Sequence, residues 1–111
     1  MSCLLFTAQY KYSGDNRIDI TYKNGNKIFA PDKKFVWEYK TGKINEETYT
    51  KYYHQKMQKS FTDYAKEWMK IVDLSFCVFV CFCNKDSFCH RKLLVKYFEK
   101  LGCNYSGELI L

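Results

Sequence analysis

The stretch FCVFVCFCNKDSFCHRKLL, residues 76–94, predicts the central part of the fold. It begins with an unbroken apolar run, residues 76–82, which is typical of a strand buried on both faces. Leucine and aromatic side chains then recur at helical spacing between Leu93 and Leu101. The sequence therefore predicts a buried strand that leads through a polar turn into a helix.

The turn between this strand and this helix carries polar and reactive side chains. If Ser87 caps the helix, then Cys89, His90 and Arg91 occupy its first turn, beside backbone N–H groups that attract anions. In an α/β sheet, ligands usually bind where strands end and the following helices begin. We therefore predict a site at this Cys-His-Arg triplet, with Cys83 and Ser87 as neighbouring binding residues.

The composition describes a small basic protein. Its 111 residues suffice for one domain, residues 1–111, and carry a net charge of +6. The amino terminus has no visible export signal, so we expect the six cysteines to stay reduced in the cytoplasm, or in the host cytoplasm for a viral protein. The longest apolar run is far below the ~20 residues that span a bilayer, so we expect no membrane partner.

The rest of the chain predicts the other elements of an α/β fold. We expect strands at residues 3–8, 17–22 and 105–111, and helical segments at residues 31–39 and 45–68. Aromatic residues at steps of three and four indicate that the second helical segment, either one helix or two, packs on a core. Because strands alternate with helices, we predict a small, mostly parallel, Rossmann-like sheet of three to five strands flanked by helices.

The cysteine-rich turn has four interpretations, of which zinc binding is the first. The four candidate zinc ligands are Cys81, Cys83, Cys89 and His90. Their spacing differs from that of the usual structural zinc site, which uses pairs separated by two to four residues. Adjacent side chains on a helix also point about 100° apart, so zinc is a minor alternative here.

The other three interpretations need no metal. Cys89 near a helix start is a candidate thiolate nucleophile, because His90 and Arg91 flank it. Alternatively, Arg91 binds phosphate or carboxylate without covalent chemistry, and His90 contributes a hydrogen bond. In the last interpretation, cysteines such as Cys77 and Cys81 only fill the core as small apolar residues.

A resemblance to a known family is centred on the same strand, turn and helix. The stretch FCVFVCFCNKDSFCHRKLLVKYFEKLGCNYSGE resembles the signature of domain-of-unknown-function family 488, in which a buried strand, a turn with a Cys-His-Arg triplet and a helix follow one another. Earlier segments, such as LLFTAQYKYSGDNRIDIT, resemble a compact subgroup from bacteria, phages and large DNA viruses. By this resemblance Cys89, His90 and Arg91 match the family triplet, and other matching positions are Thr7, Tyr10, Arg17, Asp19, Ala30, Pro31, Tyr49, Tyr53 and Glu108. The family has no settled activity to transfer.

Two functions from different classes follow as hypotheses. In the first, the chain binds, and as an enzyme converts, a phosphorylated small molecule such as a nucleotide. Its catalytic groups are then Cys89, His90 and Glu108, and its binding residues are Arg91, Cys83, Ser87, Thr7, Tyr10 and Arg17. In the second, a viral or phage accessory protein binds a host protein or nucleic acid through its lysine and aromatic surface. Eleven lysines against six carboxylates in residues 23–70 are compatible with either hypothesis.

Overall fold

A four-stranded parallel sheet forms one layer of the protein. The structure is a computed structural model that describes residues 3–82 and 88–110. The strands lie in the order β2-β3-β1-β4, and every neighbouring pair is parallel. They are β1 (Leu4–Gln9), β2 (Arg17–Asp19), β3 (Phe76–Cys81) and β4 (Asn104–Glu108). The predicted small parallel sheet is therefore confirmed, although β2 ends at Asp19 and not at residue 22, and the last strand runs from Asn104 to Glu108 and not over residues 105–111.

The predicted buried strand is one of the two central strands. β3 pairs with β1 from Phe76 opposite Leu4 to Cys81 opposite Gln9. All of its residues are buried except Phe76, which is half-buried. An unbroken apolar run is what a strand needs when both of its faces pack against other residues.

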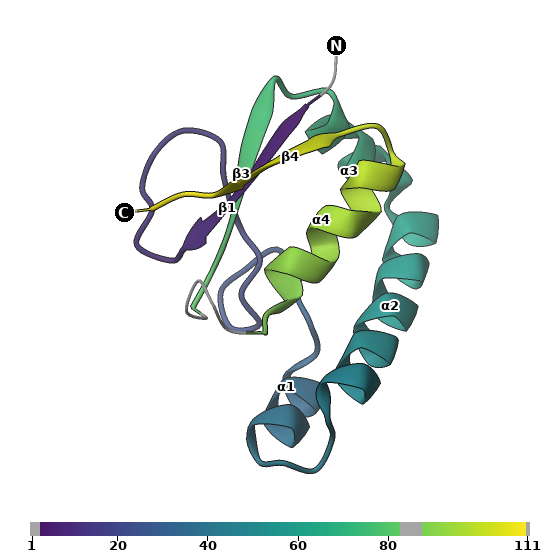
Figure 1. Cartoon of the computed structure of the whole chain (residues 1–111). Helices are drawn as coiled ribbons and strands as arrows, with labels where there is room; N and C mark the ends of the chain where they lie inside the picture. The colour runs from purple at the N-terminus through teal and green to yellow at the C-terminus, as the bar shows by residue number, and fades with distance from the viewer. Residues whose placement is uncertain (1–2, 83–87, 111) are drawn as a thin grey trace.

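Four helices cover one face of the sheet. They are α1 (Lys33–Lys40), α2 (Glu46–Asp63), α3 (Ala65–Val72) and α4 (His90–Lys100). Figure 1 shows α4 against the sheet and α2 beyond it. The predicted second helical segment is two helices, which meet at Tyr64. The predicted cap of α2 is confirmed, because the Asn45 side chain accepts a hydrogen bond from the backbone N–H of Thr48 at 2.8 Å.

Side chains of the strands and of the segments that follow them cover the opposite face of the sheet. Alternation along β3 points Phe79 and Cys81 towards the helices, and Val78 and Val80 away from them. Half-buried side chains from the strands and from the loop after β1 pack over this second face: Phe6, Tyr10, Tyr12, Phe76 and Leu109. In the part of the chain that the structure describes, no helix is long and apolar enough to span a bilayer.

A β-bulge positions the last strand. Between Leu5 and Phe6 the register of β1 against β4 shifts, so that Tyr105 lies opposite Leu5 and Gly107 lies opposite Phe6. Gly107 has a φ of 113°, which side-chain-bearing residues rarely adopt. Residues three apart in a regular strand face opposite sides, but the bulge turns both Tyr105 and Glu108 towards α4. This places the Glu108 carboxylate near the start of that helix.

Candidate functional site

A cavity of about 320 Å³ opens where β2 and β3 end and α4 begins. Its aromatic walls are formed by Tyr22, Tyr39, Tyr49, Phe82 and Phe88. The buried side chains of Cys81, Cys89 and His90 also line it. The cavity therefore lies at the carboxyl edge of a parallel sheet, where α/β proteins usually bind ligands.

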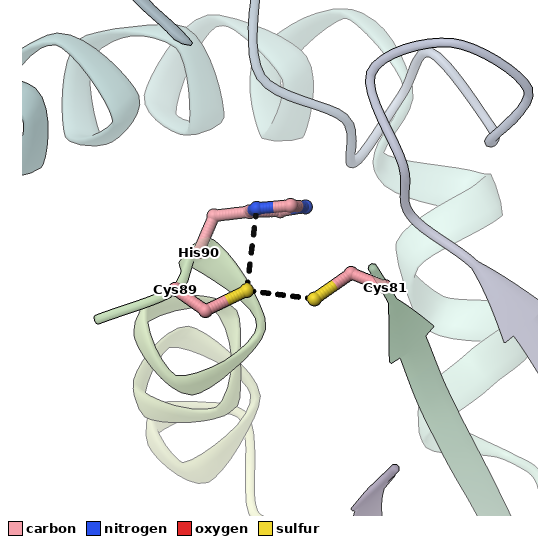
Figure 2. Close-up of side chains that lie close together, drawn as sticks. All are labelled: Cys81, Cys89 and His90. Carbon is pink, nitrogen blue, oxygen red and sulfur yellow. Dashed lines mark hydrogen bonds between the residues drawn. The ribbon is translucent and has the colours of Figure 1, made fainter. Parts of the chain in front are cut away.

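Two cysteines and a histidine meet in this cavity (Figure 2). The Sγ atoms of Cys81 and Cys89 are 2.7 Å apart, and Cys89 Sγ lies 3.7 Å from His90 Nδ1. Cys81 is the last residue of β3, whereas Cys89 and His90 belong to the start of α4. The donor atoms of the three residues all lie within 4.8 Å of one another, so they can hold a metal ion.

Cys89 and His90 converge because Cys89 is not helical. It is the cap residue of α4, with an extended backbone (φ −155°, ψ 145°), and the helix begins at His90. The expectation that Cys89 lies in the first helical turn was therefore wrong, and so was the 100° divergence derived from it. Extended geometry at the cap turns the thiol towards the imidazole instead. The predicted residues Cys83 and Ser87 lie outside the described part of the chain.

His90 is held in one orientation by the backbone. Its Nε2 lies 2.6 Å from the carbonyl oxygen of Ile20, and a carbonyl can only accept a hydrogen bond. The Nε2 atom therefore carries the proton, and the Nδ1 lone pair is directed at Cys89. Burial lowers the pKa of His90, and the charges of Arg91 and Lys56 add to this, whereas Cys81 and the Ile20 carbonyl oppose it. The imidazole is therefore neutral near pH 7.

Arg91 connects the cysteine cluster to the last strand. It is fully buried, and its Nε and Nη2 atoms each donate to a different oxygen of Glu108 at 3.2 Å. Its Nη1 donates to Cys81 Sγ at 2.9 Å. Burial opposes the charge of Arg91, but Cys81, Cys89 and Glu108 outweigh it and raise its pKa. Neither Arg91 nor Glu108 is among the residues that line the cavity.

The remaining predicted binding residues are not among those that line the cavity, although Tyr10 stacks on Phe82, which does, with ring centres 4.1 Å apart. Thr7 is buried in β1, where its hydroxyl shares a hydrogen bond of 2.7 Å with the Tyr105 hydroxyl. Arg17 lies over the ring of Tyr10 and donates to the carbonyl oxygens of Tyr10 and Tyr12. Tyr10 and Tyr12 pack over the second face of the sheet, so the contacts of Arg17 with them order the loop after β1.

The sequence did not single out a cluster of lysines beside the cavity. The Nζ atoms of Lys23 and Lys40 lie 5.9 and 5.4 Å from the centre of the Tyr22 ring. Lys33 and Lys40 line a smaller hollow that also contains Tyr22 and Val36. Because Tyr22 and Val36 also line the main cavity, the smaller hollow adjoins it. Among the described residues, no ion pair involves any of these three lysines. The lysine excess of residues 23–70 was the only sequence signal for this cluster.

Comparison with known proteins identifies one family. The family model DUF488-N3a, described as the active DUF488-N3 subclade, matches residues 4–102. The match includes β1 to β3, all four helices and the Cys-His-Arg triplet, and it ends before β4 and Glu108. No curated protein and no solved structure matches the chain significantly.

Proposed function

The chain belongs to the DUF488 family, and we propose that it binds a phosphorylated small molecule with a planar ring, such as a nucleotide. The ligand would occupy the cavity at the ends of β2 and β3. The observation that carries this proposal is the combination of aromatic walls with three lysines at Tyr22 that have no ion-pair partner in the described part of the chain.

The walls of the cavity suit a flat ring. Tyr39, Tyr49 and Phe88 pack against one another with ring centres 5.3 to 5.5 Å apart, and together they form one aromatic surface. Aromatic side chains stack on any nucleobase, with a gain of about 1–3 kcal/mol per base. The volume of about 320 Å³ is at the small end of the range for ligand pockets, which favours a ligand of low molecular mass.

The lysine cluster suits a phosphate. The ammonium groups of Lys23 and Lys40 lie at the Tyr22 ring, and Lys33 lines the adjoining hollow, so positive charge is concentrated beside the cavity; the protein also has an excess of basic residues overall. In this arrangement Lys23, Lys33 and Lys40 take the role that the sequence had suggested for Arg91, whose guanidinium is bonded to Glu108 and Cys81. Phosphate binding by Arg91 itself stays a prediction.

The same arrangement assigns different roles to the predicted catalytic groups. Cys89 and His90 line the cavity, so they are the groups that would contact a bound ligand and act on it if the protein is an enzyme. Glu108 holds Arg91, and Arg91 holds the Cys81 thiol, so this pair acts as positioning residues. Mass spectrometry of each incubated nucleotide would detect conversion.

Calorimetric titration with nucleoside monophosphates, diphosphates and the matching nucleosides tests the proposal. We expect the phosphorylated compounds to bind more tightly than the nucleosides, and added salt to weaken them selectively. Lys40→Gln should weaken the phosphorylated compounds about fivefold to tenfold, because one ammonium group near the surface contributes about 1 kcal/mol. Lys66→Gln is the matched control, since Lys66 is an exposed lysine of α3 outside the cavity.

Two results would contradict the proposal. One is that no phosphorylated compound binds the parent protein. The other is that Lys40→Gln and Lys66→Gln behave alike. Binding of oligonucleotides or of a protein that is insensitive to Lys40→Gln would favour the accessory-protein hypothesis instead.

A further inference from the structure

We propose that Cys81, Cys89 and His90 bind a zinc ion and leave one coordination position open to the cavity. This goes beyond the proposed ligand site, because it concerns a metal that binds whether or not a nucleotide is present. In residues 3–82 and 88–110, this is the one group of three or more metal-ligating side chains whose donor atoms lie close together. Two thiolates and one imidazole are ligands that zinc prefers.

The distances between the donor atoms fit a zinc ion after one small movement. Zinc–sulfur and zinc–nitrogen bonds of about 2.3 and 2.0 Å place neighbouring ligands of a tetrahedron about 3.6 to 3.8 Å apart. Cys89 Sγ and His90 Nδ1 already lie 3.7 Å apart. The two sulfur atoms are 2.7 Å apart and must separate by about 1 Å, which rotation of one cysteine side chain provides. Their separation is well above the about 2.05 Å of a disulfide.

The hydrogen bond of His90 prepares it as a ligand. Histidines that bind metals usually donate their second ring N–H to a carbonyl or a carboxylate, which fixes the tautomer and the orientation of the ring. His90 donates from Nε2 to the Ile20 carbonyl at 2.6 Å and directs Nδ1 at the cysteines.

The charges around the cluster balance when zinc is bound. The buried Arg91 cation is already paired with the Glu108 carboxylate. Zinc with two cysteine thiolates adds no further net charge, which matters because buried unpaired charges are costly. The Arg91 Nη1 group donates to Cys81 Sγ at 2.9 Å, and a hydrogen bond of this kind stabilises a metal-bound thiolate.

The open position faces the cavity because all three ligands line it. Structural zinc sites are closed by four protein ligands, whereas catalytic sites use three and keep a water or substrate in the fourth position. Among residues 3–82 and 88–110 the site offers two cysteines and one histidine, which is the number of protein ligands in the open type. Zinc lowers the pKa of a water bound in such a position, which is how catalytic zinc sites produce a nucleophile.

Cobalt substitution tests the site in the absence of nucleotide, so its outcome is independent of the ligand titration. The full chain is purified under reducing conditions, stripped of metal with a chelator and titrated with Co²⁺. We expect one Co²⁺ per chain, visible bands of tetrahedral cobalt and a sulfur-to-cobalt charge-transfer band. Zinc should displace the cobalt stoichiometrically. Elemental analysis of the protein as purified should give one zinc per chain.

Substitutions then identify the ligands. Cys81→Ser, Cys89→Ser and His90→Gln should each weaken binding beyond the about 10–100-fold that follows loss of an outer-shell partner. Each cysteine variant should also halve the charge-transfer band. Cys103→Ser is the matched control, because Cys103 is a buried cysteine outside the cluster, and it should leave the spectrum unchanged.

Three results would overturn the proposal. The first is that the reduced parent protein binds no stoichiometric cobalt or zinc, a measurement that does not depend on whether any variant folds. The second is a cobalt spectrum that is unchanged in both Cys81→Ser and Cys89→Ser. The third is a disulfide between Cys81 and Cys89 in the purified protein, found by mass spectrometry without reduction, whose reduction does not create a metal site.

Discussion

The Arg91 guanidinium and the Glu108 carboxylate form a two-point ion pair that joins the start of α4 to β4. Both N···O distances are 3.2 Å, and Arg91 is completely buried while the Glu108 side chain is 14% exposed. The third contact of Arg91, with Cys81 on β3, extends this connection to the cavity. One side chain therefore connects three elements of the fold.

We expect Glu108→Gln to destabilise the protein by about 3 kcal/mol, because it removes the carboxylate charge that pairs with the buried Arg91 guanidinium at two points. Chemical denaturation followed by circular dichroism measures the change. The control is Asp63→Asn, which removes the exposed pair between Lys59 and Asp63 and should cost at most about 0.5 kcal/mol. Equal losses of stability in the two variants would contradict the prediction, because the buried pair would then contribute no more than the exposed one.

The lowered pKa of His90 predicts that the metal-free protein loses stability in mild acid. The unfolded chain takes up a proton near pH 6.5 while the native imidazole stays neutral, so the free energy of unfolding falls as pH drops below about 6.5. Above about pH 6.5 the imidazole is neutral in both the native and the unfolded chain, so His90 no longer makes the free energy of unfolding depend on pH. The groups that surround the imidazole are Cys81, Cys89, Arg91, Lys56 and Tyr53.

Denaturation curves between pH 5 and 8 check this dependence. His90→Gln should flatten it, because the variant has no group that titrates in this range at that position. His54→Gln is the natural control, since His54 is the other of the two histidines in the chain. A pH dependence that persists in His90→Gln and vanishes in His54→Gln would assign the effect to His54 and contradict the prediction.

Ser60 connects three segments through one hydroxyl group. It donates to the Ile28 carbonyl at 2.6 Å and accepts from the Trp68 indole N–H at 3.0 Å. Ser60→Ala leaves both partners without this bond, so we expect a loss of about 1–3 kcal/mol in the free energy of unfolding. Thr62→Ala, two residues along α2, removes an exposed hydroxyl and should change stability by at most about 0.5 kcal/mol. Comparable losses in both variants would contradict this account.

Cys103 should be slow to react with alkylating reagents. Burial raises the pKa of its thiol to about 11, and Cys3 adds to the shift. At pH 8 only about one thiol in a thousand is then the reactive thiolate, compared with about one in four for an ordinary cysteine. Peptide mapping after treatment with iodoacetamide should show a rate at Cys103 that rises about tenfold per pH unit. A native rate equal to that of the denatured protein would contradict the prediction.

Local sequence pattern was enough to predict the parallel sheet and the order of strands and helices along the chain. The apolar run at residues 76–82 has no polar interruption, so it can only be stable between two packed layers. Asn45 was identifiable as a cap because its hydrogen bond partner is three residues away. Each of these features depends on neighbours in the chain, and periodicity records such neighbours directly.

The composition of the site depends on contacts that periodicity does not record. Glu108 reaches Arg91 because a bulge in β4 turns it towards α4, and Cys89 meets His90 because an extended cap precedes the helix. Tyr10 and Arg17, which were also predicted as binding residues, pack on each other and do not themselves line the cavity.

The lysine cluster shows the same limit most clearly. Lys33 and Lys40 are the first and last residues of α1, whereas Lys23 belongs to the loop after β2 and comes close to Lys40 only at the ring of Tyr22. Spacing along the chain states which side of an element is buried, but it contains no information on which distant residues share that side. Strand register and the paths of the connections determine those neighbours, and they are set by the packing of the whole chain.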